Sequence, residues 1–176
     1  MGSGKVLNFS VGVAAKGNPG VAGVVSETSG AIGYIGSEYA LALNLTSALM
    51  QNSAGNFIEA NSTTISAAAN VDMPADTRIM ITNSPEPEAY PISTFTWLIL
   101  YKEQSYNNRS VNTAKALKEL LCYVISEDGQ QIAVKTHYAP LSPLAVEKTK
   151  AIIESMTYGG NPVVLDEKTD NSNKTE

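Results

Sequence analysis

The spacing of hydrophobic residues changes repeatedly along the first 51 residues, which predicts alternating strands and helices. Residues 5–13 (KVLNFSVGV) have the composition of a strand and lead into the loop AAKGNPG. Apolar residues at helical spacing follow over residues 19–28, with Asn18 as the expected cap and Pro19 at the first helical position. The run AIGYIG (31–36) then predicts a short buried strand, and residues 37–51 predict a second helix. This order of elements indicates an α/β fold.

Three regularly spaced glycines, Gly30, Gly33 and Gly36, raise the question of a phosphate-binding loop. Such loops place their glycines before a helix, where free N–H groups and the positive end of the helix dipole face the anion. Here the glycines follow the predicted helix. We therefore predict structural roles: Gly30 ends the helix in a left-handed conformation, and the later glycines allow close backbone approach.

The remainder of the chain is predicted to be polar at first and then helical. Residues 52–89 are rich in Asn and Ser, with a short helix predicted within 62–74 and an extended, proline-fixed connection over 84–91. ISTFTWLILYKE (92–103) is the strongest predicted strand. Helices are predicted over 111–126, ended by EDG, and over 143–156, capped by Ser142 and stopped by Gly159 and Gly160. From Asp166 onward the chain reads as a solvated tail.

Composition narrows the classes of protein that this chain can represent. With 43% apolar residues the chain can build a core, and its net charge of −5 argues against binding a nucleic-acid backbone. No apolar run approaches the roughly 20 residues that cross a bilayer. Residues 1–9 have no apolar stretch of the signal-peptide kind, and the single cysteine, Cys122, does not identify the compartment.

Candidate catalytic groups are few, and each has a simpler explanation. GSGK (2–5) lacks both the first glycine and the Ser or Thr of a phosphate-binding loop. His137, the only histidine, is expected to pack in a loop, and Cys122 to be a small core residue of an apolar helix. Glu86 and Glu88 are expected to be exposed charges of a proline-rich connection. The sequence therefore predicts no enzyme, no cofactor and no metal site.

The loop before the first predicted helix is the one place where contact with an anion is physically plausible. Lys16, Gly17 and Asn18 combine a positive charge with the N–H groups of a helix start, and both favour negative charge. The alternative, which we favour, is that Asn18 caps the helix and Lys16 is simply solvated. These three residues are the only candidate ligand-binding residues in the chain.

A series of motifs resembles one family in order as well as in content. The K-G-N-x-G loop, the GAIGY turn, the YPI strand entry and the YAPL loop before a last helix are similar to the C-terminal half of phosphate-binding proteins of the high-affinity bacterial phosphate ABC transporter. The resemblance covers about residues 4–158. It implies a periplasmic binding protein type II-like fold, in which two α/β lobes joined by crossover strands hold an anion between them.

The resemblance also implies how the chain is divided. SPEPEAYPISTF resembles the returning crossover, so residues 1–90 would form part of the second lobe and residues 91–160 part of the first. Residues 161–176 would be a disordered tail. Both lobes would be incomplete, and the strand after Pro91 would pack against first-lobe strands supplied from upstream.

The family's phosphate ligands have no counterpart in this chain. They include a Ser-Gly-Thr loop, and the nearest likeness here, STT at 62–64, lies in the wrong place. The resemblance thus implies a phosphate-binding component of an ABC importer, present as a C-terminal portion that lacks the main anion ligands. Its implied partners are inorganic phosphate, bound through the full-length parent, and an ABC permease, in the periplasm or at the cell surface. The alternative is a standalone, non-enzymatic interaction or surface protein of the same fold, able to self-associate through exposed sheet edges.

Overall fold

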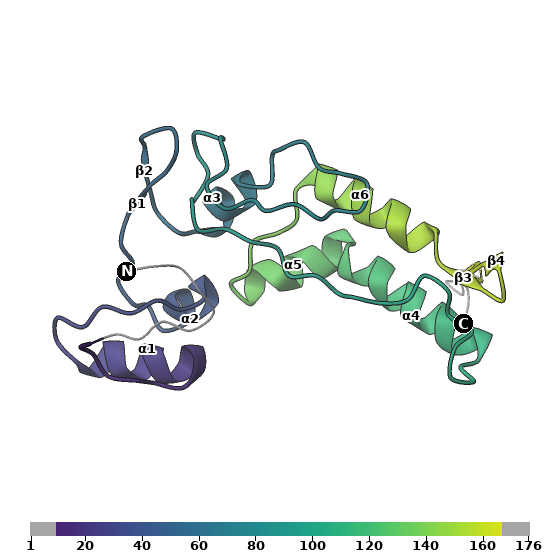
Figure 1. Ribbon diagram of the computed structural model, residues 1–176, viewed down its shortest axis with the longest axis horizontal. Coiled ribbons are helices and arrows are strands. Elements are labelled where there is room, and N and C mark those ends of the chain that lie inside the picture. The colour runs from purple at the N-terminus through teal and green to yellow at the C-terminus, as the bar shows by residue number, and fades with distance from the viewer. Residues whose placement is uncertain (1–9, 167–176) are drawn as a thin grey trace, which may run out of the picture. The chain divides into compact units, whose positions relative to one another are not determined.

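The computed structural model describes residues 10–166 (Figure 1). The chain divides into two compact units, the first ending at Ser47 and the second beginning at Ala48. Most of the predicted strand 5–13, together with the GSGK stretch, lies outside the described residues, as does most of the predicted tail.

The first unit is built around helix α1 (Gly17–Glu27), whose Ala22 is fully buried, followed by helix α2 (Ser37–Ala42). Gly30 has φ +78°, as predicted for a residue that ends a helix. The predicted strand 31–36 is wrong, because these residues pair with no strand among the described residues. The predicted helix 37–51 is also too long, since Asn44 has φ +52° just after α2.

The second unit begins with a small hairpin of strands β1 (Met50–Gln51) and β2 (Phe57–Ile58), which pair antiparallel. Helix α3 (Ser62–Ala67) follows and lies within the helix predicted for 62–74. Asn61 caps it in a reciprocal arrangement, because its side chain accepts from the Thr64 N–H while the Thr64 hydroxyl accepts from the Asn61 N–H.

Three further helices follow, each begun by a serine cap. They are α4 (Val111–Val124), α5 (Glu127–Lys135) and α6 (Pro143–Glu154), capped by Ser110, Ser126 and Ser142 respectively. The helices predicted at 111–126 and 143–156 are confirmed. The prediction that EDG stops the first of them is wrong. The Ser126 hydroxyl accepts from the Gly129 N–H, so these residues begin α5.

A second hairpin closes the described chain. Strand β3 (Thr157–Tyr158) pairs antiparallel with β4 (Asn161–Pro162), and Val163 is buried at 2% exposure. Residues 161–163 therefore belong to this folded segment and not to the tail predicted for 161–176. Lys118, only 9% exposed, donates a hydrogen bond of 2.5 Å to the Val163 carbonyl oxygen and holds this segment against α4.

The buried hydrophobic residues of the second unit form two clusters. One joins α4, α6 and the residue after β4, and it consists of Ala114, Leu121, Ile153, Met156 and Val163. The other lies around the end of α3, and it consists of Ala68, Ala69, Ile81 and Ala89, with Phe95 packed against it. Small residues dominate the second cluster, so it buries less apolar surface per residue than the first.

The segment predicted as the strongest strand, 92–103, is not a strand in this structure. It runs as a long connection without regular secondary structure (Figure 1), and only Glu103 forms a β-bridge, with Thr157. The physical reason is that a strand needs a neighbour, and the described residues provide none along 94–101. The segment has the composition of a strand, but within residues 10–166 it has no strand to pair with.

Candidate functional site

The predicted anion-facing loop lies at the start of α1, in the first unit. Lys16 is the N-cap residue and is exposed, and Gly17 begins the helix with φ +66°. The prediction that Asn18 caps the helix is wrong, because Asn18 already lies in the first turn and no side chain caps α1. The first turn contains no acidic residue, so no carboxylate of this turn offsets the positive end of the helix dipole.

This arrangement has some of the features that an anion site needs, but not all of them. A buried phosphate dianion requires many charge-assisted hydrogen bonds, because an unpaired buried charge is heavily penalised. Lys16, Gly17 and Asn18 are all exposed, and Lys16 is the only cation among them. By themselves these residues can form a weak, solvent-screened contact with an anion.

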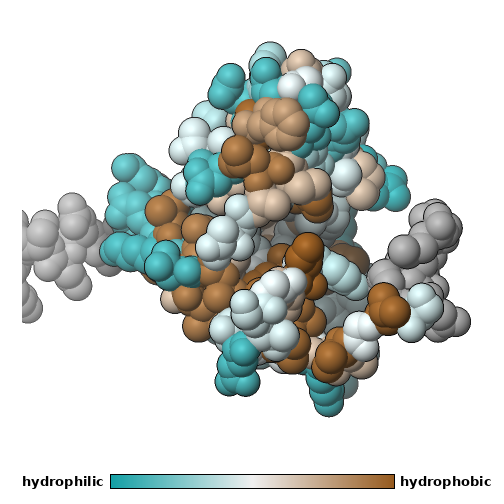
Figure 2. Space-filling view, turned by 90° about the vertical axis from the view of Figure 1, so that its left-hand side faces the viewer, coloured by the Kyte–Doolittle hydropathy of each residue, from teal (hydrophilic) through white to brown (hydrophobic). Residues whose placement is uncertain are grey.

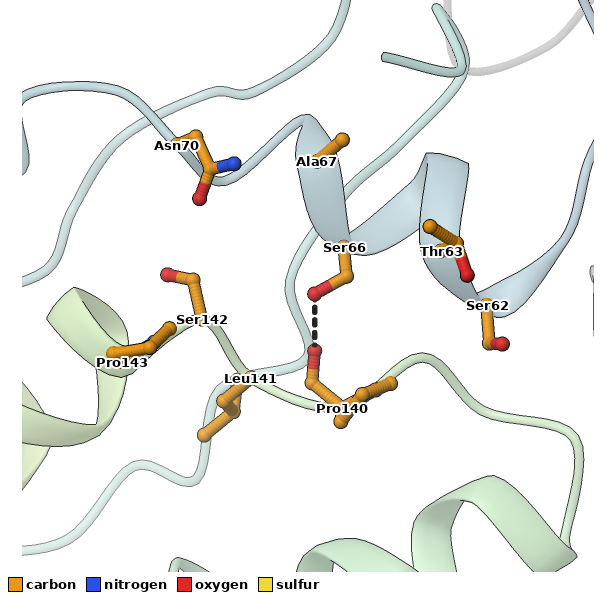
Figure 3. Close-up of a pocket in the computed structure, with 9 residues that line it drawn as sticks. All are labelled: Ser62, Thr63, Ser66, Ala67, Asn70, Pro140, Leu141, Ser142 and Pro143. Carbon is orange, nitrogen blue, oxygen red and sulfur yellow. Dashed lines mark hydrogen bonds between the residues drawn. The ribbon is translucent and has the colours of Figure 1, made fainter. Parts of the chain in front are cut away.

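A hydroxyl-rich hollow of about 410 Å³ lies in the second unit, between α3 and the loop that precedes α6. Its walls are formed by Ser62, Thr63, Ser66, Ala67, Asn70, Pro140, Leu141, Ser142 and Pro143 (Figure 3). The Ser66 hydroxyl crosses the hollow and donates a hydrogen bond of 2.9 Å to the Pro140 carbonyl oxygen. The Ser142 hydroxyl accepts from the Ala145 N–H and donates to the Ala69 carbonyl oxygen at 3.5 Å.

The hollow contains no charged side chain, and two of its hydroxyls already bind backbone groups. The hydrogen bonds of Ser66 and Ser142 hold α3 against the start of α6. The hollow lacks the groups for acid–base or nucleophilic chemistry. In the sequence, STT at 62–64 is only a poor likeness to the family's ligand loop. The structure places Ser62 and Thr63 on the wall of this hollow.

Sequence reasoning missed a set of four hydrogen bonds to the Glu103 side chain in the second unit. The carboxylate accepts hydrogen bonds from the N–H groups of Ser105, Gly159 and Gly160 and from the Thr157 hydroxyl, at 2.9 to 3.1 Å. Hydrogen bonding to Ser105, through its side chain first and then its N–H, lowers the pKa of Glu103 to about 2, and the N–H groups of Gly160 and Gly159 act in the same direction. The available signal was the Gly-Gly pair at 159–160, but nothing local connects it with Glu103, 56 residues away from Gly159.

The other residues singled out from the sequence lie apart from one another. His137 is exposed, with φ +66°, and follows α5, so it ends a helix and does not pack as predicted. Cys122 is partly buried against the first cluster, as predicted. Glu88 is exposed and Glu86 half-buried in the proline-rich connection.

The described residues show neither a metal-binding cluster nor a helix able to cross a membrane. Within 10–166 no three His, Cys, Asp or Glu side chains come together in a way that could hold a metal ion. The helices described there are all too short or too polar to cross a membrane.

Comparison with known proteins defines the class. The family model of the PBP superfamily domain matches residues 2–128, and the chain belongs to this family. The mixed helix and strand content of this chain agrees with the α/β periplasmic binding protein class that the sequence predicts. This is a family of solute-binding proteins and not of enzymes.

Several curated relatives carry one name. The chain is similar to the phosphate-binding protein PstS of Methanocaldococcus jannaschii, with 34% identity over 155 residues, which are 80% of this chain and 39% of the relative. It is 31% identical to that of Xylella fastidiosa, over 86% of this chain and 41% of the relative, and 27% identical to that of Pasteurella multocida, over 86% and 43%. The resemblance drawn from the motifs is therefore confirmed. The chain spans about two fifths of the length of these relatives.

Proposed function

We propose that this chain is a portion of the phosphate-binding component of an ABC importer. The observation that carries the proposal is the match of about 154 residues to proteins named for phosphate binding, at 27 to 34% identity. Membership of the PBP superfamily supports the same reading. The implied partners are inorganic phosphate and an ABC permease, and the implied location is the periplasm or the cell surface.

The proposed division follows the lobes of the family. Residues 1–90 contribute to the second lobe, residues 91–160 return to the first, and the stretch 84–91 serves as part of the crossover. The prolines of this stretch support that role, because Pro91 is buried and its carbonyl oxygen accepts from the Asn83 N–H at 2.7 Å. A connection fixed at that point suits the boundary between two moving bodies.

The main phosphate ligands are proposed to lie in the part of the family that this chain does not match. Lys16, Gly17 and Asn18 then add a secondary, exposed contact at the start of α1. Their exposure supports a weak role, because solvent and salt screen a lone lysine. The hollow between α3 and α6 carries no charge and is not proposed as the phosphate site.

The first test is calorimetric titration of the isolated chain with phosphate, with sulfate as the matched control, after circular dichroism has established that the chain is folded. We expect no saturable heat from either anion. Selective, saturable binding of phosphate that disappears in Lys16→Gln would place the main site in this chain and overturn the assignment of ligands. Lys135→Gln, which removes a cation from the end of α5, is the control variant.

The second test restores the missing ligands. A chimera carries this chain in place of the matched 154 residues of the Xylella fastidiosa relative. We expect this chimera to bind phosphate and not sulfate. A chimera that unfolds cooperatively but binds neither anion would overturn the proposed function.

One observation favours a second candidate, a standalone interaction protein of the same fold. Residues 97–101 expose large apolar side chains, with Ile99 97% exposed, as interaction surfaces do. Such a protein would self-associate through this surface without phosphate. Sedimentation of the chain at increasing concentration separates the two readings, because the importer component is expected to remain monomeric.

A further inference from the structure

The turn that follows helix α2 contains the motif Asn-x-Ser/Thr, the acceptor sequence for N-linked glycosylation. Its three residues are Asn44, Leu45 and Thr46. Asn44 and Thr46 are both exposed, and residues 45–49 have no regular secondary structure. A glycan acceptor lies on an exposed loop, because its asparagine and its hydroxyl must both reach a transferase. The motif thus lies in the kind of segment that such an enzyme can bind.

The backbone explains the asparagine at position 44 but not the threonine at position 46. Asn44 has φ +52°, a left-handed conformation that asparagine adopts more readily than most residues at a helix end. Asn83 and Asn107 also have positive φ, and neither is followed two residues later by Ser or Thr. A helix end needs no hydroxyl at that spacing, so the turn by itself gives no reason for Thr46.

The polar side chains of this motif are free to bind an enzyme. Within residues 10–166, neither the side-chain amide of Asn44 nor the hydroxyl of Thr46 forms a hydrogen bond. Only the backbone is held, since the Asn44 N–H donates to the Leu41 carbonyl oxygen at 3.2 Å. The Leu45 N–H donates likewise to the Ala40 carbonyl oxygen at 2.8 Å. No side-chain hydrogen bond within the described residues therefore has to break before the amide reaches a transferase.

Other copies of the motif differ from this one in their contacts. They begin at Asn8, Asn61, Asn108 and Asn173, of which the first and last lie outside the described residues. The Asn61 side chain caps α3 and accepts from the Thr64 N–H at 3.0 Å. After Asn108, the hydroxyl of the motif belongs to Ser110, which caps α4 and accepts from the Thr113 N–H at 3.1 Å. A transferase would have to break a helix cap at either place.

We propose that Asn44 is the acceptor of an N-linked glycan in the folded chain, in preference to Asn61 and Asn108. The donor is an oligosaccharide attached to a polyprenyl phosphate or diphosphate. The side-chain nitrogen of Asn44 bonds to the anomeric carbon of the sugar as the bond from that carbon to the phosphate oxygen breaks. The electron pair of that bond leaves with the lipid phosphate, and one amide proton passes to a base of the transferase.

A glycan at Asn44 would add hydrated surface beside apolar side chains. Leu41 and Leu43 are 41% and 54% exposed. Hydrophobic residues lie among hydrophilic ones at the surface that Figure 2 shows. Glycans are bulky and solubilising, so one attached here would shield such side chains from contacts with other molecules. In a cell this modification rests on the proposed periplasmic or surface location, because the motif is used in exported proteins.

The experiment is glycosylation of the purified, folded 176-residue chain in solution. The reagents are a single-subunit oligosaccharyltransferase specific for Asn-x-Ser/Thr and a polyprenyl-diphosphate oligosaccharide. Intact mass counts the glycans, and fragmentation of the digested chain assigns them to residues. Each rate is divided by the rate for a synthetic peptide of the same sequence, which removes the preference of the enzyme for one sequence over another. We expect a corrected rate at Asn44 at least about fivefold above those at Asn61 and Asn108, because a cap opposes transfer at each of those two.

Variants of the hydroxyl residue test the motif without changing the turn. Thr46→Ala is expected to abolish the glycan on Asn44, and Thr46→Ser to restore it. Thr63→Ala, which removes an exposed threonine from the motif at Asn61, is the matched control and should leave the glycan on Asn44 unchanged. An unmodified Asn44 would overturn the proposal, as would equal corrected rates at Asn44, Asn61 and Asn108. The assay needs neither export nor phosphate, so its failure is distinct from failure of the proposed function.

Discussion

Glu103 and Thr157 are joined twice, once through side chains and once through the backbone. The Thr157 hydroxyl donates to the Glu103 carboxylate at 2.9 Å, and the two residues form a parallel β-bridge. The same carboxylate accepts from the N–H groups of Gly159 and Gly160. The Glu103 side chain thus holds the turn of the last hairpin to the end of the predicted strand 92–103.

Glu103→Gln is expected to lower the thermal stability of the protein at neutral pH. The pKa of Glu103 is about 2 in the folded protein against an ordinary value of 4.5, so the carboxylate stabilises the fold fully above pH 4.5 and loses this effect as the pH falls toward 2. The difference in Tm between the two proteins should therefore be largest near pH 7 and disappear by about pH 2. Glu154→Gln, which alters only an exposed pair with Lys150 at 4.0 Å, is the control and should change Tm little. A difference that does not depend on pH would contradict this role.

Asn52→Asp is expected to destabilise the second unit by about 2–4 kcal/mol. Asn52 is 6% exposed, and its amide nitrogen donates to the carbonyl oxygens of Pro87 at 2.8 Å and Ala89 at 3.2 Å. A carboxylate at position 52 cannot donate a hydrogen bond and would lie against both carbonyl oxygens. Urea denaturation followed by circular dichroism measures the loss, and Asn70→Asp, at an exposed residue, should stay within about 0.5 kcal/mol. Equal losses in the two variants would disprove the role given to Asn52.

Gly33→Ala is expected to destabilise the first unit by about 1–3 kcal/mol. A Cβ atom at Gly33 would lie 2.8 Å from methyl groups of both Val21 and Val25 on α1. In contrast, Gly23→Ala meets nothing within 4 Å and should stabilise α1 by about 0.5–1 kcal/mol. Hydrogen exchange of the α1 amides reports both effects within this unit. Faster exchange in Gly23→Ala than in Gly33→Ala would refute the contact.

Leu121→Ala should cost about 2–5 kcal/mol, because it opens a cavity in the cluster that joins α4 and α6. Leu121 is 6% exposed, whereas its neighbour Leu120 is 56% exposed on the same helix. Leu120→Ala is therefore the matched control and should cost less than about 1 kcal/mol. Chemical denaturation with coincident fluorescence and circular dichroism probes measures both. A larger loss in Leu120→Ala would mean that this face of α4 is buried in solution.

The sequence predicted the elements whose determinants are local. The helix that begins at Val111 is predictable from its apolar spacing, and the helix that begins at Pro143 from its proline and its Ser142 cap, because these signals need only neighbouring residues. Asn18 has the residue type of a cap and precedes a proline, but the helix begins one residue earlier, at Gly17, which takes a positive φ. The EDG stretch resembles a helix stop, but Ser126 caps a new helix there.

What the sequence could not predict depends on partners far along the chain. Residues 92–103 have the composition of a strand, but whether they form one depends on neighbouring strands, which composition does not reveal. The contacts of Glu103 bring together residues more than 50 positions apart, so no local pattern reveals them. For the candidate anion loop, the sequence identified Lys16, Gly17 and Asn18 together, and the structure shows all three exposed at the start of α1.

The hollow between α3 and α6 has a consequence for how the chain is made. Ser66 binds the Pro140 carbonyl oxygen 74 residues later in the sequence, and Ser142 binds that of Ala69 73 residues earlier. At a translation rate of about 5–20 residues per second, α3 leaves the ribosome roughly 4–15 s before the residues that hold it. During that interval α3 lacks both of these hydrogen bonds, so its position against the loop before α6 is set only once residues 140–142 have been made.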